Sequence, residues 1–257
     1  MSEPPRIASL VPSLTELVCA LGLAHRLVAR TGYCIHPAEA VRDVPKVGGT
    51  KEVNLTKLRR LAPTHVLLNV DENRAETAAA LRDFVPELVV THPCDPRDNL
   101  ALIDQLATVF VTEPGVAERA AALRADMAGE LALTAAQQFM PQRVLYLIWR
   151  EPWMTVARDT YIARMLAAVG WKTLPEVEGG PTGAARYPQV DPGAPWLADV
   201  DRVLLSSEPY RFDDVHVAEA QALCPQARVQ AVDGELLSWY GPRAAAGLRY
   251  LRALAAG

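Results

Sequence analysis

The chain has 257 residues, half of them hydrophobic, and a formal net charge of −4. This is enough apolar sequence for one large domain or two lobes of ordinary size, and the charge balance argues against nucleic acid or an anionic membrane surface as a partner. No apolar run approaches the roughly 20 residues of a membrane span, so we expect no membrane insertion. Residues 1–5 lack the basic and apolar regions of a secretory signal. We therefore expect a cytoplasmic protein, the alternative being a periplasmic one whose leader has been removed.

The first predicted elements are a strand and a helix that follow one another directly. Residues 7–11 are mostly apolar and predict a strand, which Pro12 ends. Ser13 and Glu16 have the spacing of a capping box, and apolar residues then recur at helical spacing as far as Gly22. Because open α/β sheets bind ligands where a strand's carboxyl end meets a helix, this junction is a candidate binding site.

Strands and helices alternate through the rest of the first half. We predict strands at 27–30, 65–70 and 88–91 and helices at 54–61 and 72–84. This alternation is typical of βαβ units and a parallel sheet. Between residues 113 and 139, strong helix formers dominate and no strong breaker occurs until Pro141. That stretch predicts one helix of about 26 residues, roughly 39 Å long.

The alternation restarts in the second half. We predict strands at 143–149, 202–206 and 228–232, a terminal helix at 241–255, and a helix that Asp159 or Thr160 caps and Gly170 ends. Gly22 and Gly170 close the first helix of each half in the same way, which suggests an internal repeat. The sequence thus predicts an α/β fold in which two lobes with parallel sheets, 1–112 and 141–257, are joined by a long backbone helix within 113–140. A single doubly wound domain is the alternative, but it does not account for the long helix.

The order of these elements resembles that of the class III periplasmic binding proteins, helical backbone metal receptors that carry cobalamin and ferric siderophores. The segments Val-Gly-Gly-Thr at 47–50, Val-Asn-Leu at 53–55 and Leu-Ala-Pro-Thr-His-Val at 61–66 are also similar to the first lobe of that family. The cobalamin-binding branch is the most similar. The resemblance implies a soluble receptor, not an enzyme and without a resident cofactor, that binds a corrinoid or a related metal chelate in a cleft between the lobes.

Candidate ligand-binding residues lie in the loops that leave the carboxyl ends of predicted strands. In the first half they are Ser13, Tyr33, His36, Gly49, Thr50, Asp71, Glu72 and Asn73. In the second half they are Trp149, Arg150, Trp153, Glu208, Tyr210, Arg211, Trp239 and Tyr240. Flat macrocycles are held by rigid aromatic walls, so we expect Trp149, Trp153 and Trp239 to contact the ligand. The alternative is that these rings fill the core of the second lobe.

Several polar candidates have ordinary structural alternatives. If these residues do not bind a ligand, residues 206–211 form an ordinary turn, residues 71–73 only cap a helix, and Arg150 pairs with Glu151. A second functional hypothesis is the ferric-siderophore-binding component of an ABC importer. An anionic siderophore would favour a cleft dominated by arginines, of which the candidates are Arg150, Arg186 and Arg211.

A third hypothesis is a metal-binding protein or enzyme that uses Cys34, His36, His92 and Cys94. Both Cys/His pairs follow predicted strands, so the four side chains would form a tetrahedral zinc site if they converged. One intervening residue is tighter than the usual zinc spacing, and the alternative is a buried thiol beside loop histidines. The sequence has no Gly-rich phosphate loop, no Gly-x-Ser-x-Gly and no paired-carboxylate signature.

The resemblance also bears on partners. Members that deliver ligand to an importer carry an exposed glutamate on each lobe for docking to the permease. The first commonly follows the Asn-Leu found here at 54–55, where this chain has Thr56, and Asp191 is the only acid in the second region, 191–195. Together with the expected cytoplasmic location, this argues against docking to an ABC permease and favours a binding protein outside the transport pathway.

Overall fold

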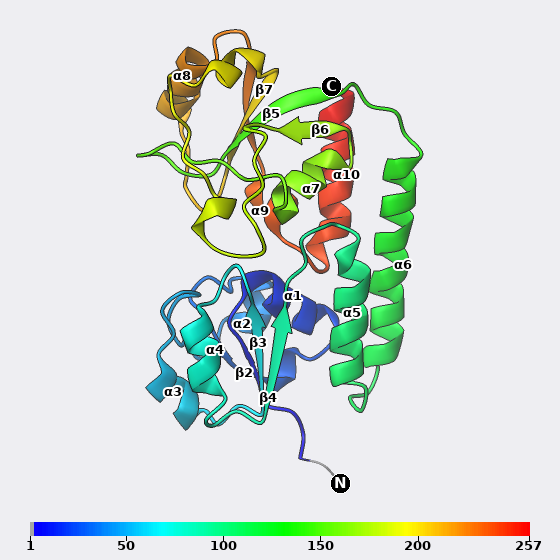
Figure 1. Cartoon of the computed structure of the whole chain (residues 1–257). Helices are drawn as coiled ribbons and strands as arrows, with labels where there is room; N and C mark the ends of the chain where they lie inside the picture. The colour runs from blue at the N-terminus through cyan, green and yellow to red at the C-terminus, as the bar shows by residue number, and fades with distance from the viewer. Residues whose placement is uncertain (1–2) are drawn as a thin grey trace. The chain divides into compact units, whose positions relative to one another are not determined.

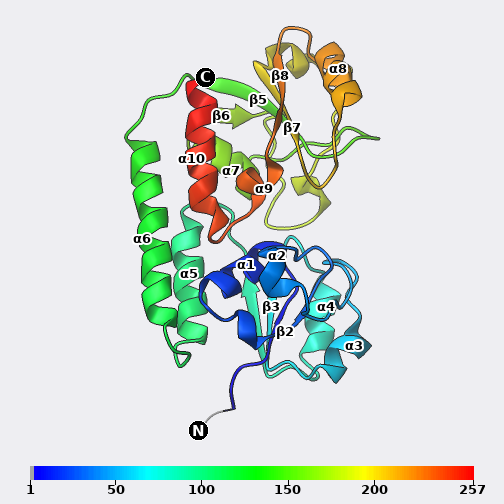
Figure 2. The same ribbon diagram turned by 180° about the vertical axis from the view of Figure 1, so that it is seen from behind.

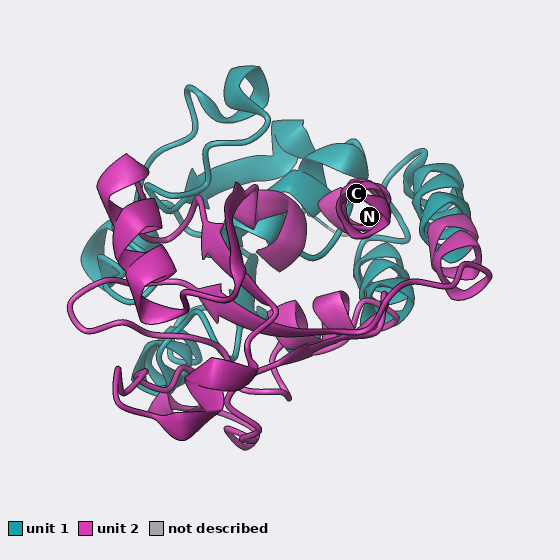
Figure 3. Cartoon of the chain, turned by 90° about the horizontal axis from the view of Figure 1, so that it is seen from above, with its two compact units in different colours: residues 1–93, 98–128, 240–242 teal, residues 94–97, 129–239, 243–257 magenta. Residues whose placement is uncertain are grey.

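The computed structural model describes residues 3–257 and divides into two compact units. Unit 1 comprises the chain up to Pro93, Asp98–Ala128 and Tyr240–Pro242, and unit 2 comprises Cys94–Arg97, Gly129–Trp239 and Arg243–Gly257 (Figure 3). Two short segments are therefore assigned differently from the sequence around them: Cys94–Arg97 belongs to unit 2, and Tyr240–Pro242 belongs to unit 1. No helix within residues 3–257 is long and apolar enough to cross a membrane.

Unit 1 is built on a four-stranded parallel sheet in the order β2-β1-β3-β4 (Figure 1). Its strands are β1 (Ile7–Ser9), β2 (Leu27–Arg30), β3 (His65–Asn69) and β4 (Glu87–Thr91). Its helices are α1 (Pro12–Ala20), η1 (Ala24–Arg26), α2 (Ala38–Val41), α3 (Leu55–Arg60), α4 (Ala75–Leu81) and α5 (Asp98–Val109). The central strands β1 and β3 are almost wholly buried, as expected for a parallel sheet covered on both faces.

The start of α1 differs from the sequence prediction. The N-cap is Val11, in an extended conformation and without a side-chain cap bond, and Pro12 occupies the first turn. The predicted Ser13–Glu16 capping box is therefore wrong, because the fixed φ of proline suits the first helical position and the helix begins two residues earlier. The end of α1 is as predicted, since Gly22 has φ +81° and its N–H donates to the carbonyl oxygen of Cys19 at 2.9 Å.

Unit 2 repeats the topology of unit 1. Its parallel sheet has the order β6-β5-β7-β8, with β5 (Gln142–Leu147), β6 (Trp171–Thr173), β7 (Arg202–Ser206) and β8 (Arg228–Val232). The helices of unit 2 are α7 (Tyr161–Ala167), η2 (Ala184–Arg186), η3 (Pro195–Asp199), α8 (Asp214–Leu223), α9 (Gly234–Ser238) and α10 (Arg243–Ala256). As predicted, Thr160 caps α7, its hydroxyl accepting from the N–H of Ala163 at 3.3 Å.

The predicted long helix is α6 (Val116–Ala135), which has 20 residues. It is shorter than expected at both ends: Gly115 takes a positive φ of +76° and delays its start, and the helix ends at Ala135. The boundary between the units falls inside α6, between Ala128 and Gly129. In unit 1, α6 lies beside α5 in both views (Figures 1 and 2), and Arg124 and Asp104 form an ion pair of 3.1 Å there.

Buried acids anchor the chain at and near both ends of α6. Glu113, just before the helix, has 8% of its side chain exposed and pairs with Arg26 of unit 1 at 2.8 Å. Glu130, in the last turns, pairs with Arg249 and Arg252 of α10 in unit 2 at 2.8 and 2.5 Å. Although burial disfavours its charged form, these two arginines hold the pKa of Glu130 below its usual range. Each unit therefore fixes its own part of the helix through charge-assisted bonds.

Two helix glycines should respond oppositely to alanine. A Cβ on Gly129, inside α6, would meet nothing within 4 Å. Because glycine costs roughly 0.5–1 kcal/mol relative to alanine in a helix interior, we expect Gly129→Ala to raise the free energy of unfolding by about that amount. A Cβ on Gly247 would collide with the carbonyl oxygen of Leu236, where α10 packs against α9. Gly247→Ala should therefore destabilise the protein. Urea denaturation measures both effects, and a shift of both variants in the same direction would contradict this explanation.

Candidate functional site

Tyr33 stands exposed on an internally braced loop after β2 in unit 1. The loop is organised by Arg30, which is only 5% exposed. The Arg30 guanidinium donates to the carbonyl oxygens of Val41, Cys34 and Thr31 at 2.8, 3.0 and 3.2 Å. These hydrogen bonds compensate for the burial of the guanidinium and hold the loop backbone in place. The Tyr33 side chain, 65% exposed, projects from this loop.

Gly49 allows the backbone to approach the Tyr33 ring closely. A Cβ at position 49 would lie 3.3 Å from Cε2 of Tyr33, tighter than most packed contacts. Thr50, the next residue, accepts a hydrogen bond from the side-chain amide of Asn73 at 2.9 Å through its carbonyl oxygen. The predicted residues Tyr33, Gly49, Thr50 and Asn73 therefore gather at the carboxyl edge of the unit 1 sheet.

The segment after β3 is held by amide side chains. Asn73, 7% exposed, accepts from the N–H of Asn69 at 2.9 Å and donates to the carbonyl oxygen of Leu10 at 3.3 Å. Asn69 in turn accepts from the N–H groups of Asp71 and Glu72 at 2.8 and 3.2 Å. Helix α4 begins only at Ala75 and has no side-chain cap. Residues 71–73 therefore do not cap α4, and the Asn73 side chain instead braces the neighbouring loops.

Tyr240 belongs to unit 1, whereas the sequence prediction placed it with the second lobe. Its hydroxyl donates to Glu72 at 2.8 Å, and the side chain is 5% exposed. Burial, reinforced by the nearby Glu72 charge, raises the pKa of Tyr240 well above its usual value. Ser13 is also buried, at 3% exposed, within α1. Both predicted residues are parts of the interior of unit 1.

The four residues of the hypothetical zinc site do not gather. Cys34 is buried beside the hydroxyl of Thr31, 3.1 Å away, and burial raises the pKa of its thiol. His92 lies 3.4 Å from Asp71, while Cys94 belongs to unit 2, where Arg186 donates to its sulfur at 3.6 Å. Within residues 3–257, no group of three or more His, Cys, Asp or Glu side chains is placed to hold a metal ion.

Unit 2 presents an aromatic cluster where β5 and β7 end. Trp149, after β5, is 42% exposed and lies edge-on to Tyr210, with ring centroids 5.3 Å apart. Trp153 is 7% exposed, belongs to the apolar core of unit 2 and stacks on Phe212 at 5.9 Å. Arg150 lies 4.6 Å above the Trp153 ring and pairs with Glu219 at 2.7 Å, closer than the predicted partner Glu151 at 3.9 Å.

Trp239 is bound within unit 2 by the carboxyl group of Glu208. The indole N–H of Trp239 and the hydroxyl of Ser238 donate to the same Glu208 oxygen at 2.6 and 2.7 Å. Trp239 is 8% exposed, and the Arg243 guanidinium lies 4.7 Å from its ring centroid. Burial raises the pKa of Glu208, although both hydrogen bonds favour its charged form. Of the three tryptophans predicted to form a ligand wall, Trp149 is 42% exposed, Trp153 lies in the apolar core of unit 2, and Trp239 is buried beside Glu208.

The remaining candidates are exposed or partly exposed residues, and the sequence did not reveal several supporting residues. Arg211 is exposed and His36 half-buried. The missed residues are Arg30, Phe212, His216 and Glu219, which hold the loops carrying Tyr33, Tyr210 and Trp149. The Asp213–His216 spacing was the one available signal, because it fits the residue pattern of a helix cap.

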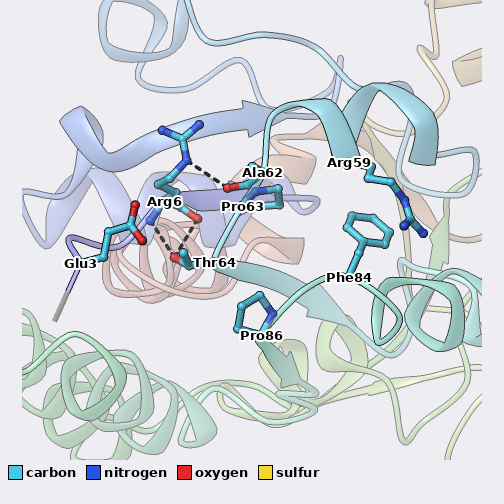
Figure 4. A pocket seen from close by; sticks show the side chains of 8 residues that line it. All are labelled: Glu3, Arg6, Arg59, Ala62, Pro63, Thr64, Phe84 and Pro86. Atoms are coloured by element: carbon cyan, nitrogen blue, oxygen red, sulfur yellow. Dashed lines mark hydrogen bonds between the residues drawn. The ribbon is translucent and has the colours of Figure 1, made fainter.

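A separate hollow of about 430 Å³ lies in unit 1 near the amino ends of β1, β3 and β4 (Figure 4). Its lining residues are Glu3, Arg6, Arg59, Ala62, Pro63, Thr64, Phe84 and Pro86. Arg6 donates to the carbonyl oxygens of Ala62 and Leu61 at 2.9 and 2.7 Å, and Arg59 lies 4.3 Å above the Phe84 ring. None of the predicted ligand-binding residues lines this hollow, and the predicted residues of unit 1 lie at the opposite edge of its sheet.

Residues 7–221 match the family described as periplasmic binding protein. The chain belongs to this family. A vitamin B12-binding protein of Vibrio vulnificus (strain YJ016) is 26% identical over 216 residues, 83% of this chain and 72% of the relative. An uncharacterized ABC transporter substrate-binding lipoprotein, YvrC of Bacillus subtilis (strain 168), is 24% identical over 268 residues, 97% of this chain and 79% of the relative.

Solved structures share the fold. The periplasmic vitamin B12 binding protein BtuF of Vibrio cholerae has a TM-score of 0.79 at 21% identity, covering 97% of this chain and 98% of that one. A periplasmic heme-binding protein from Pseudomonas aeruginosa has a TM-score of 0.79 at 22% identity, covering 98% and 93%. The predicted α/β fold of two parallel-sheet units is thereby confirmed, and the relatives are substrate-binding proteins rather than enzymes.

The expected cytoplasmic location is wrong. The matching family consists of periplasmic binding proteins, and the similar proteins are named as periplasmic or as a lipoprotein of an ABC transporter. The expectation depended on the composition of residues 1–5, which does not outweigh membership of this family.

Glu208→Gln tests the buried carboxyl group of unit 2. Because the folded-state pKa of Glu208 lies above the ordinary value of 4.5, its ionisation disfavours folding as pH rises above that value. Glutamine retains an oxygen acceptor for Ser238 and Trp239 but does not titrate. The stability of the variant relative to the wild type should therefore increase between about pH 4 and pH 7, as measured by urea denaturation across that range.

Asp201→Asn is the control of opposite sign. Hydrogen bonds from Arg143 hold the pKa of Asp201 below its ordinary value of 3.8, so its carboxylate stabilises the fold above that pH and loses this effect as pH falls. The asparagine variant should lose stability relative to the wild type as pH rises through about 4. A Glu208→Gln difference that also fell with rising pH would contradict the assignment.

Proposed function

We propose that the protein is a receptor for a corrinoid, a cobalamin-like metal chelate, and that it works by binding alone. The observation that carries the proposal is the Trp149 ring, 42% exposed at the carboxyl end of β5 and supported from the side by Tyr210. An exposed indole that is supported from the side offers a flat apolar face, which suits a large flat ligand. The vitamin B12-binding proteins among the relatives support the same ligand class.

Unit 1 has an exposed aromatic ring of its own. Tyr33 is 65% exposed on the loop that Arg30 braces, and its phenol combines an apolar face with a polar end. A corrinoid carries amide groups around its ring, so a phenol hydroxyl provides a hydrogen-bonding partner in addition to apolar contact. The ligand brings its own metal, and the chain's residues orient it and remove its surface from water.

The arginines do not favour an anionic siderophore. Arg186 is 1% exposed and donates to the carbonyl oxygen of Gly180 at 2.6 Å, and Arg150 pairs with Glu219. Arg211 is the exposed member of the predicted arginine set. A site that relied on several guanidinium groups to bind an anion would need them directed at the ligand rather than at their own unit.

We infer that the partner is the permease of an ABC importer. The family and the lipoprotein relative support this partner, and they outweigh the argument against docking that the sequence suggested. Thr56 is exposed in the first turn of α3, where the family resemblance led us to expect glutamate. Its presence removes one ionic contact but leaves the rest of the unit 1 surface available, and Asp191 is exposed in unit 2.

Titration with cobalamin tests the ligand and the role of Trp149 together. The corrin ring absorbs where tryptophan emits, so binding should quench the protein's fluorescence saturably. Trp149→Ala should weaken binding by about tenfold or more, since a stacked aromatic contact is worth on the order of 1 kcal/mol beyond the area that it buries. Replacement of Trp153 or Trp239 is a poorer test, because removing a buried Trp costs about 3–5 kcal/mol of stability.

Trp196→Ala is the matched control. Trp196 lies in the short helix η3 and packs partly buried against the core of unit 2, so its loss should leave cobalamin affinity unchanged. Parallel titrations with hemin and a ferric siderophore complete the test. Absence of cobalamin binding at micromolar concentration, or preference for either competitor, would overturn the corrinoid assignment. Undiminished affinity in Trp149→Ala would remove Trp149 from the site.

A further inference from the structure

A chain of ring contacts supports the exposed Trp149 in unit 2. Trp149 meets Tyr210 edge-on, with an interplanar angle of 71°. The Tyr210 ring in turn packs against the rings of Phe212 and His216, with centroid separations of 4.9 and 5.3 Å. The position of the exposed indole therefore depends on how Tyr210 is held, and Tyr210 lies in the connection between β7 and α8, outside any regular element.

His216 provides the hydrogen bond that fixes Tyr210. The phenol oxygen of Tyr210 lies 3.0 Å from Nε2 of His216. A phenol hydroxyl both donates and accepts, whereas the imidazole nitrogen donates or accepts according to its tautomer. The bond can therefore form in both neutral tautomers of His216 and in its protonated form.

His216 is itself anchored at the start of α8. Nδ1 of His216 lies 2.6 Å from the Asp213 carboxylate and 3.1 Å from the backbone nitrogen of Asp213, so it donates to the first or accepts from the second according to its tautomer. The Asp213 carboxylate also accepts from the backbone N–H groups of Val215 and His216 at 3.0 and 3.3 Å. This reciprocal arrangement is a capping box in which a histidine takes the place usually occupied by Glu or Gln. The His216 side chain is 17% exposed and also contacts the Phe212 ring at 5.6 Å.

The loop after β5 is tied to the same helix. Arg150 follows Trp149 in the sequence and pairs with Glu219 of α8 at 2.7 Å, while Trp153 stacks on Phe212. Helix α8 is thus connected to Trp149 in two ways. Glu219 pairs with Arg150, the next residue in the sequence, and His216 bonds to Tyr210, whose ring packs against the indole.

We propose that His216 is a positioning residue, which holds Tyr210 edge-on to Trp149 and thereby fixes the indole for a flat ligand. The identity of the ligand rests on the proposed function, but the position of the Trp149 side chain can be measured without any ligand. A side chain fixed before binding loses less conformational entropy when the ligand arrives, so release of Trp149 should weaken binding by about three- to tenfold.

His216→Gln separates positioning from helix capping. Glutamine at this place can still accept from the N–H of Asp213 and complete the capping box, but it lacks the ring nitrogen that reaches Tyr210. His216→Gln and Tyr210→Phe should each weaken cobalamin binding by about three- to tenfold, and the double variant should bind no more weakly than either one. Additive losses would overturn the proposal, because they would show that the two residues act independently.

His65→Gln is the matched control. His65 lies in unit 1, its side chain is also 17% exposed, and its partners are likewise a hydroxyl, that of Thr64 at 2.8 Å, and a carboxylate, that of Glu87 at 3.3 Å. Its replacement should cost a comparable number of contacts without changing cobalamin affinity. An equal loss of affinity in His65→Gln would show that the His216 effect is only general destabilisation.

Fluorine NMR of protein labelled with 5-fluorotryptophan tests the positioning without a ligand. Trp149→Phe identifies the resonance of Trp149. That resonance should shift in both His216→Gln and Tyr210→Phe and stay in place in His65→Gln. An unchanged Trp149 resonance in His216→Gln overturns the proposal whatever the ligand is. If the wild type fails to bind cobalamin while the resonance shifts as expected, the ligand assignment fails and the positioning role stands.

Discussion

Parallel pairing of the strands within each unit is the constraint on which the candidate site depends. When all strands of a sheet run the same way, every loop that follows a strand emerges at the same edge. Tyr33, Gly49 and Asn73 reach that edge in unit 1, and Trp149 and Tyr210 reach it in unit 2, although long stretches of sequence separate them. Because both units have the same strand order, both use the same edge to present side chains.

The loops at those edges are organised by buried polar side chains rather than by regular structure. Arg30 satisfies the carbonyl groups of the Tyr33 loop, Asn73 joins backbone from three segments of unit 1, and Glu208 holds Trp239 and Ser238 in unit 2. A buried polar group is costly unless it is hydrogen-bonded, so each of these residues favours one loop conformation strongly over others. The result is a pair of preformed surfaces in which a few aromatic rings remain exposed.

Much of the fold could be predicted from local sequence patterns. Strands β2, β7 and β8 match their predicted ranges, and Gly22 and Gly170 follow their helices with positive φ as expected. The errors have local physical causes, since Pro12 moves the start of α1 and Gly115 shortens α6. Helices α2, α5, α8 and α9 and the short strand β6 were not predicted. Helix α9 and strand β6 have only 5 and 3 residues, too few to show a clear periodicity.

The site was less predictable, because the direction of a loop side chain depends on distant partners. Trp149 and Trp153 stand four residues apart in one loop, yet one is exposed and the other lies in the core beside Phe212. Tyr240 joins unit 1 through Glu72, a partner 168 residues earlier that no local pattern reveals.

The central claim is that the ligand is a corrinoid, and the most direct measurement is the identity of the ligand that the protein carries in its own host. Protein freshly purified from that host should show the visible absorption bands of a corrin, and metal analysis should find cobalt in stoichiometric amount. A porphyrin Soret band, or iron with the charge-transfer band of a ferric siderophore, would contradict the account.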